Sequence, residues 1–180
     1  MNFEKVMLDC FKMVSSLEDS GEMASYIPEL AQVDSTKFGV HIYTIDQVGY
    51  GTGDYFDKFS IQSISKVLSL SLAYSILGEK IWERVGVEPS GTSFNSLVQL
   101  EADNGIPRNP FLNAGALVVA DILLSNLKDP KADFLNFVRG ISNNATLQYS
   151  DRVSESEKAV GYRNVALCNF IKSLGNIKNE

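Results

Sequence analysis

Two stretches of the sequence, residues 63–77 and 113–127, have apolar side chains on most sides of the helices that their spacing predicts. A surface helix of a globular protein keeps a polar face, so a helix that is apolar on most sides belongs in a core. Gly78 follows the first stretch and supplies a natural C-terminal stop. The fold therefore has to cover two buried helices with other elements.

Several other segments show helical patterns and could provide that cover. The first twenty residues have apolar side chains at steps of three and four, which predicts an amphipathic helix ending near Ser20-Gly21. Asp129-Pro130 is a good cap and first-turn pair for a helix that Gly140 would end. The remaining predicted helices span residues 79–85 and 154–174.

Strand patterns are scarce by comparison. Residues 38–45 are rich in β-branched and aromatic types, residues 46–49 form a turn signal, and residues 50–52 can return as a second strand. An isolated two-stranded hairpin is only marginally stable in water. Either the fold is mostly helical, or further strands lie beyond residue 180. We therefore expect an α+β class that is dominated by helices and has a small antiparallel sheet.

The length of the chain limits the number of domains, and its charge limits the molecules that it is expected to bind. A chain of 180 residues makes one domain or slightly more. Its formal net charge is −6 and it has no basic run, which argues against nucleic acid and anionic membranes as partners. The most apolar run, residues 114–120, ends at Asp121 and is too short to cross a bilayer. The acidic N-terminal segment does not resemble a secretory signal, so we expect a cytoplasmic protein.

The sequence offers no metal site. His41 is the single histidine, and Cys10 and Cys168 lie far apart without ligand spacing. Both cysteines fall in apolar helical stripes, so buried free thiols are favoured over a disulfide. His41 lies in a predicted strand, where a packing role is favoured over a catalytic one.

The clearest chemical signal is Ser63-Ile64-Ser65-Lys66 at the start of the first apolar helix. A three-residue step keeps Ser63 and Lys66 on one helical face. An S-x-x-K pair in this position can activate a serine without a histidine, provided that the lysine is neutral enough to accept a proton. In the alternative interpretation, Ser63 only caps the helix and Lys66 is a solvated surface residue.

The surroundings of this pair strengthen the catalytic interpretation, because the chain resembles the serine-dependent glutaminases through several blocks in the same order. These blocks are Tyr26-Ile27-Pro28-Glu29-Leu30, Gln62-Ser63-Ile64-Ser65-Lys66, Val85-Gly86 with Glu88-Pro89-Ser90-Gly91 and Phe94-Asn95, Asn109-Pro110-Phe111-Leu112-Asn113-Ala114-Gly115-Ala116, and Ser156-Glu157 with Arg163-Asn164.

The resemblance implies part of a β-lactamase- or transpeptidase-like fold, hydrolysis of L-glutamine to L-glutamate and ammonia without a metal or organic cofactor, and a homo-oligomer. It implies that Ser63 is the nucleophile and that Lys66 activates it. The substrate-contacting residues that it implies are Tyr26, Gln62, Ser63, Asn113, Glu157 and Asn164.

The implied binding residues also have structural interpretations. Asn113 could cap the helix that follows it. Glu157 could be an ordinary surface carboxylate, although a carboxylate is the natural partner for the α-ammonium group of glutamine. Asn164 follows Glu157 by seven residues, so a continuous helix would place both on the same side.

The catalytic domain of that family is longer than this chain, and its C-terminal part contributes tyrosines and a Lys-Ser/Thr-Gly strand. The sequence contains neither Lys-Thr-Gly nor Lys-Ser-Gly. We therefore expect residues 1–180 to correspond to the N-terminal part of a glutaminase catalytic domain. Two alternatives remain open, a glutaminase-like module without turnover and another Ser-Lys acyl-transfer enzyme such as a β-lactamase.

Overall fold

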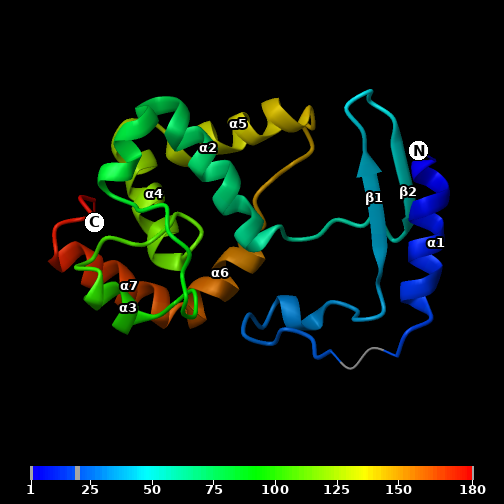
Figure 1. Cartoon of the computed structure of the whole chain (residues 1–180), viewed down its shortest axis with the longest axis horizontal. Helices are drawn as coiled ribbons and strands as arrows, with labels where there is room; N and C mark the ends of the chain where they lie inside the picture. Colours follow the sequence, from blue (N-terminus) through cyan, green and yellow to red (C-terminus); the bar gives the residue numbers. More distant parts are fainter. Residues whose placement is uncertain (1, 19–20, 180) are drawn as a thin grey trace. The chain divides into compact units, whose positions relative to one another are not determined.

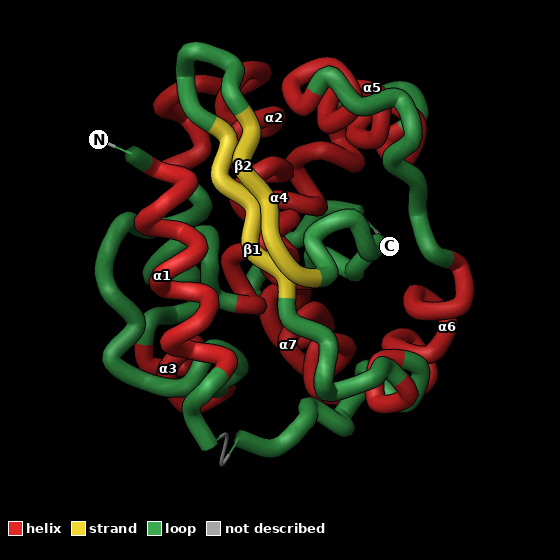
Figure 2. The backbone as a smooth tube through the Cα atoms, turned by 90° about the vertical axis from the view of Figure 1, so that its right-hand side faces the viewer, coloured by secondary structure: helices red, strands yellow, loops and turns green. Residues whose placement is uncertain are grey.

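The computed structural model describes residues 2–18 and 21–179, in two compact units, Met1–Ser60 and Ile61–Glu180. Helices dominate the described residues, and their one sheet has two antiparallel strands (Figure 2). The predicted class, helix-dominated α+β with a small antiparallel sheet, is confirmed.

The first unit consists of a helix against a hairpin. Helix α1 (Phe3–Ser15) lies along strands β1 (Gly39–Tyr43) and β2 (Gly49–Gly53), with a short 3-10 turn, η1 (Leu30–Gln32), between α1 and β1 in the sequence (Figure 2). The side chain of Asn2 caps α1 by accepting a hydrogen bond of 3.0 Å from the backbone N–H of Lys5. The helix ends at Ser15, earlier than predicted, and the predicted stop at Ser20 lies outside the described residues.

The hairpin has the predicted strands with slightly different limits. Its register pairs Gly39 with Gly53 and Tyr43 with Gly49. The turn occupies residues 44–48 and so begins two residues earlier, and ends one residue earlier, than the sequence pattern indicates; Gln47 adopts a positive φ of 65° within it. Gln47 supplies the left-handed conformation that a tight turn needs, although glycine takes it more easily.

One face of β2 carries only glycine, and an aromatic ring occupies the space that side chains would fill. The ring of Tyr55 stacks on His41 of β1, with ring centroids 5.6 Å apart and planes 8° apart. A Cβ atom added at Gly51 would come within 2.4 Å of that Tyr55 ring. His41 therefore has a packing role, as the sequence indicates, and β2 needs glycine at this position.

We expect Gly51→Ala to destabilise the first unit by roughly 1–3 kcal/mol, because a methyl group has no room beside the Tyr55 ring. Hydrogen exchange of the β1 and β2 amides should detect the change. The double variant Gly51→Ala/Tyr55→Ala serves as control, since it removes the ring that the methyl group would meet. A Gly51→Ala protein with unchanged exchange rates in both strands would contradict this prediction.

The second unit is a helical bundle built around α4 (Asn113–Asn126). Helix α4 lies between α2 (Ser65–Leu77) and α7 (Tyr162–Ser173), and α2 also packs on α5 (Pro130–Ser142) (Figure 1). The remaining elements are η2 (Gln62–Ile64), η3 (Gly78–Glu83), α3 (Leu97–Ala102) and α6 (Asp151–Val160). The short helix predicted over residues 79–85 is thus a 3-10 helix, and α3 did not stand out in the sequence.

The core of this unit forms where the two apolar helices meet. Seven residues of α4 are buried, including Val118 and Ile122, which are fully shielded from solvent. Helix α2 contributes Ala73 to the same core, but Val67 on another face of that helix is 50% exposed. The prediction of a core position is therefore confirmed for α4 and only partly for α2.

Three finer sequence predictions are wrong. The helix predicted over residues 154–174 is interrupted at Gly161, where α6 ends and α7 begins, and glycine favours such an interruption because it is a poor helix former. Helix α5 continues past Gly140 and ends in the left-handed conformation of Asn143. Cys10 is exposed rather than buried, because it lies on the solvent side of α1; Cys10 and Cys168 are both free thiols.

A buried carboxylate joins α4 to the last described residues. Asp121 is 2% exposed, and one of its carboxylate oxygens accepts a hydrogen bond of 2.5 Å from the Arg84 guanidinium. Its other oxygen accepts bonds from the backbone N–H groups of Lys178 and Asn179, at 2.9 and 2.8 Å. The apolar helix therefore tolerates Asp121 because every side of its charge is paired.

Within residues 2–18 and 21–179, no helix is long and apolar enough to cross a membrane.

Candidate active site

Ser63 and Lys66 lie at the junction of two helical turns. Ser63 is the middle residue of η2, and Lys66 is the second residue of α2, which follows η2 without a break. Side chains three residues apart lie close to one another on such a helical surface. The Ser63 side chain is exposed, whereas Lys66 is half-buried.

The two serines of the motif differ in their hydrogen bonding. The Ser65 hydroxyl donates a bond of 2.6 Å to the backbone carbonyl of Gln62 and is thereby committed to the local turn. Among the described residues, Ser63 Oγ forms no hydrogen bond with Lys66 Nζ or with the Gln62 carbonyl. Of the two hydroxyls, the one at Ser63 is available to a ligand.

The Lys66 amine is held at one place by two oxygen acceptors. Its Nζ donates to the backbone carbonyl of Phe111 at 3.0 Å and to Oδ1 of Asn113 at 2.8 Å. The ring of Phe94 lies on another side, with its centroid 5.8 Å from Nζ. Burial lowers the pKa of Lys66 from its ordinary value, since removing water penalises the charged ammonium form.

Asn113 connects this lysine to a second helix. While its Oδ1 accepts from Lys66, its Nδ2 donates to Oδ1 of Asn164 on α7 at 3.0 Å. Helix α4 starts at Asn113, its N-cap is Leu112, and no side chain caps it. The capping interpretation of Asn113 is therefore wrong. The structure brings three of the predicted site residues, Lys66, Asn113 and Asn164, into one hydrogen-bonded row.

The other predicted site residues have separate positions. Glu157 is half-buried on α6, across the Gly161 break from Asn164, so the predicted shared helical face does not exist. Gln62 begins η2 with a positive φ of 43°, a strained value for a residue with a side chain. Tyr26 belongs to the first unit, where its side chain is 69% exposed.

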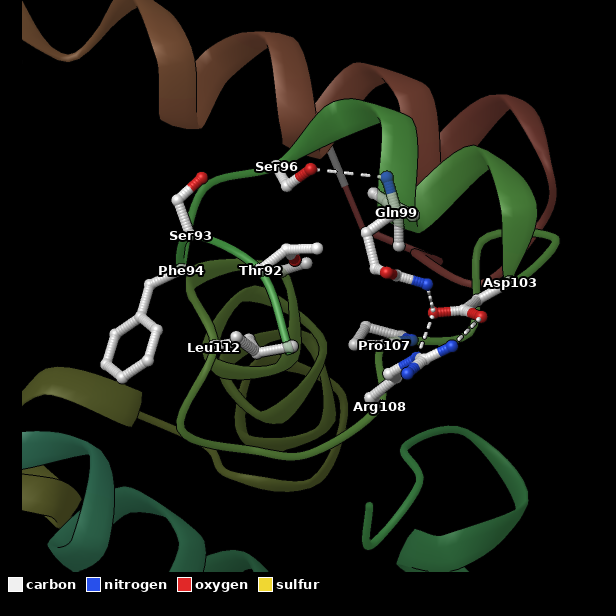
Figure 3. Close-up of a pocket in the computed structure, with 11 residues that line it drawn as sticks. Thr92, Ser93, Phe94, Ser96, Gln99, Asp103, Pro107, Arg108 and Leu112 are labelled. Carbon is white, nitrogen blue, oxygen red and sulfur yellow. Dashed lines mark hydrogen bonds and ion pairs between the residues drawn. The ribbon is translucent and has the colours of Figure 1, made fainter. Parts of the chain in front are cut away.

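A loop from Thr92 to Ser96 borders the row of polar side chains. The carbonyl of Phe94 accepts a bond of 3.0 Å from the backbone N–H of Asn113, and the Phe94 ring points away from the Asp103–Arg108 ion pair (Figure 3). The cavity beneath this loop has about 10 Å³, which is space for one water molecule and far too little for an amino acid. This cavity is therefore not a candidate site for an amino acid.

The residues in and around this row do not resemble a metal site. Among the described residues, no group of three or more histidine, cysteine, aspartate or glutamate side chains comes together to hold an ion. The row consists of one amine and two amides, with a backbone carbonyl at one end. Amides can hold a polar organic substrate by hydrogen bonds, and an amine can accept or donate a proton.

Comparison with known proteins identifies the family of this chain. A family model for glutaminase matches residues 21–180. This chain belongs to the glutaminase family. The membership inferred from the sequence blocks is thereby confirmed.

The relatives are longer than this chain. A glutaminase of Christiangramia forsetii is 52% identical over 99% of this chain, and that match covers 59% of the relative. The solved structure of a probable glutaminase, ybaS, superposes with a TM-score of 0.91 at 29% identity, covering 98% of this chain and 57% of the other. A probable glutaminase from Bacillus subtilis complexed with 6-diazo-5-oxo-L-norleucine gives a TM-score of 0.79 at 27% identity, covering all of this chain and 55% of the other. The chain thus spans 59% of this curated relative and 55–57% of these two solved chains.

The structure adds groups that the sequence did not single out as site residues. The Phe111 carbonyl and the Phe94 ring both contact Lys66, yet a backbone acceptor and a packed ring leave no residue-type signal of their own. Both residues lie inside the sequence blocks that carry the glutaminase resemblance. Attention to the apolar members of these blocks could have found them.

Proposed function

We propose that this chain carries the serine and lysine of a glutaminase active site and that it acts on L-glutamine through a serine acyl-enzyme. The observation that carries the proposal is the half-buried Lys66 amine, held by two acceptors one helical turn from the exposed Ser63 hydroxyl. Membership of the glutaminase family supplies the substrate class.

The hydrogen bonds of Lys66 suit a general base. A neutral amine has two N–H donors and one lone pair, and the acceptors at Phe111 and Asn113 use both donors. The lone pair is then left for the serine proton. Burial favours this neutral form at a pH below the ordinary lysine pKa.

The reaction then follows from acyl-transfer chemistry. The Ser63 oxygen attacks the side-chain amide carbon of glutamine while its proton passes to Lys66. The C–N bond breaks, the nitrogen takes up a proton, and ammonia leaves. Water then attacks the ester carbon and releases glutamate with the serine restored. In this proposal the backbone N–H of Ser63 would help to stabilise the oxyanion that forms on the substrate.

Substrate contacts are proposed for the remaining predicted residues. Asn164 has an amide nitrogen beyond the Oδ1 that faces Asn113, and this nitrogen can donate to the α-carboxylate of glutamine. Glu157 offers a carboxylate for the α-ammonium group. Gln62 would line the site, and residues 1–180 would form the N-terminal part of a catalytic domain that works as a homo-oligomer.

The decisive experiment uses 6-diazo-5-oxo-L-norleucine, a glutamine analogue with a diazoketone in place of the amide. In the expected reaction, Ser63 Oγ bonds to the diazo carbon, nitrogen gas leaves, and the serine proton ends on that carbon. Mass spectrometry should place the adduct on Ser63. Ser63→Ala should abolish the adduct, and Ser65→Ala should leave it. An adduct on another residue, or none, would contradict the proposal.

A second candidate, a glutaminase module without turnover, is favoured by one observation. The chain covers 59% of the Christiangramia relative, so parts of the site can lie outside it. Glutamate release from glutamine separates the two candidates, since a module binds the analogue but releases no glutamate above the level of Ser63→Ala. Another Ser-Lys acyl-transfer activity would be recognised by acylation of Ser63 with a labelled penicillin.

A further inference from the structure

The loop of residues Thr92 to Ser96 supplies two contacts to the lysine site but contains no member of the catalytic row. Its Phe94 ring lies 5.8 Å from Lys66 Nζ, and its Phe94 carbonyl accepts the Asn113 N–H. Both contacts depend on where this short irregular segment is held. The residues that hold this segment are therefore candidates for positioning residues of the lysine site.

Besides the bond between the Phe94 carbonyl and the Asn113 N–H, and a bond from the Ser90 hydroxyl to the Thr92 carbonyl, two side chains of the loop anchor it. At its C-terminal end, the Ser96 hydroxyl accepts a bond of 3.2 Å from the Gln99 N–H and caps α3 (Figure 3). Next to Phe94, Oδ1 of Asn95 accepts a bond of 3.2 Å from the guanidinium of Arg163 on α7. Arg163 is adjacent in sequence to Asn164, the last member of the polar row.

Helix α7 is thus connected to Lys66 by two routes. The inner route runs from Asn164 through Asn113 to the amine. The outer route runs from Arg163 through Asn95 to the Phe94 ring and carbonyl. A helix that contacts the loop on one side and the amide row on the other fixes the spacing between them.

We propose that Arg163 and Asn95 are positioning residues of the lysine site, and that their hydrogen bond holds the Phe94 loop against the start of α4. The proposal rests on the proposed glutaminase function, because it assigns to the pair a role in orienting the Lys66 amine toward Ser63. Arg163 suits this task, since its planar guanidinium presents donors in a fixed geometry. The bond is charge-assisted, which makes it stronger than a bond between two neutral groups.

The test combines four variants with two measurements. Arg163→Met and Asn95→Leu remove the bond while keeping side-chain bulk, and Arg163→Lys keeps a cationic donor. Lys172→Met is the matched control, because Lys172 is an exposed cation on the same helix that donates to the Asn179 carbonyl instead.

The first measurement is hydrogen exchange of the Asn113 backbone amide, which donates to the Phe94 carbonyl. It should become about five- to tenfold faster in Arg163→Met and Asn95→Leu, the factor expected for the loss of one hydrogen bond. The amides of Val118 and Ile122 in the same helix should keep their rates, which excludes general unfolding. Arg163→Lys should restore most of the protection, and Lys172→Met should change nothing.

The second measurement is the alkylation of Ser63 by 6-diazo-5-oxo-L-norleucine as a function of analogue concentration. The limiting rate should fall about tenfold in the two bond-breaking variants, since a misplaced base slows the bond-forming step. The half-saturating concentration should change less, because the loop does not include the proposed substrate contacts.

The two measurements separate this proposal from the proposed function. Unchanged exchange at Asn113 overturns the positioning role, whatever the alkylation rates. Faster exchange with an unchanged limiting rate overturns it too, because the loop would then be anchored without any effect on the lysine. If the unmodified chain gives no Ser63 adduct, the proposed function fails, and the exchange rates still decide whether the pair holds the loop.

Discussion

Replacing Lys66 with methionine should slow the alkylation of Ser63 by 6-diazo-5-oxo-L-norleucine by about two to four orders of magnitude, the usual loss when a general base is removed. Methionine keeps an unbranched stem of similar length but cannot accept the serine proton. The two acceptors at Phe111 and Asn113 lose their donor in this variant. The rate of adduct formation, followed by mass spectrometry, measures the loss.

The matched control is Lys80→Met, which removes an exposed lysine from η3 in the same unit. It should react at the rate of the unmodified chain. A Lys66→Met protein that reacts equally fast would show that Ser63 is activated by some other group. Thermal unfolding of both variants would reveal whether the loss at Lys66 reflects instability instead.

The same experiment makes a prediction about pH. Because burial lowers the pKa of Lys66, the neutral amine becomes populated at a lower pH than for a solvated lysine. The alkylation rate should therefore rise with pH and reach a plateau. The midpoint of this rise should lie below the ordinary lysine pKa. Lys66→Met should lose this rise. A midpoint at or above the ordinary value would contradict the role assigned to burial.

The sequence predicted those parts of the site that depend on near neighbours. Ser63 and Lys66 are three residues apart, so the helical period alone brings them together. In contrast, Lys66 and Asn113 are 47 residues apart, and Asn113 and Asn164 are 51 apart. Helical patterns do not fix such contacts, because they depend on how α2, α4 and α7 pack. Family resemblance named Asn113 and Asn164 as binding residues, and the structure shows that they touch.

Glu157 and Asn164 illustrate the opposite case. A continuous helix would have aligned them, and the apolar pattern across residues 154–174 favoured one helix. Gly161 interrupts it, and the backbone of α7 starts again with the Val165 N–H bonding to the Gly161 carbonyl at 3.1 Å. A single glycine costs a helix only about 1 kcal/mol, so packing decides whether the chain bends there.

Asp121 was visible in the sequence only as the residue that ends an apolar run, yet it occupies the most enclosed polar position of the described residues. Its partners come from Arg84, 37 residues earlier, and from Lys178 and Asn179, 57 and 58 residues later. A sequence pattern within α4 contains no information about them. The structure therefore adds an ion pair that ties three distant parts of the second unit together.

Asp121→Ala should destabilise the second unit by about 3–5 kcal/mol, the usual cost of leaving one member of a buried ion pair without its partner. Arg84 would remain partly buried beside a cavity, and the N–H groups of Lys178 and Asn179 would lose their acceptor. Urea unfolding followed by the fluorescence of Trp82, the single tryptophan, measures the free energy of unfolding near this site.

Two controls sharpen that experiment. Asp151→Ala removes an exposed carboxylate from the first turn of α6 and should cost about 1 kcal/mol or less. The double variant Asp121→Leu/Arg84→Met removes both charges and should be more stable than Asp121→Ala, because no unpaired guanidinium is left behind. A loss below 1 kcal/mol for Asp121→Ala would mean that the ion pair contributes little to the unit.

The contribution of Asp121 should also disappear in acid. Burial alone would raise the pKa of Asp121, but the hydrogen bonds from Arg84, Asn179 and Lys178 outweigh burial and hold the pKa below its ordinary value. A carboxyl group whose pKa is lowered in the folded state contributes its full stabilisation above its unfolded-state pKa of about 3.9. This stabilisation is lost as the pH falls through the folded-state pKa. The difference in unfolding free energy between the unmodified chain and Asp121→Asn should therefore be largest at neutral pH and shrink below about pH 4. A difference that stays constant across this range would show that the charge of Asp121 is not what stabilises the unit.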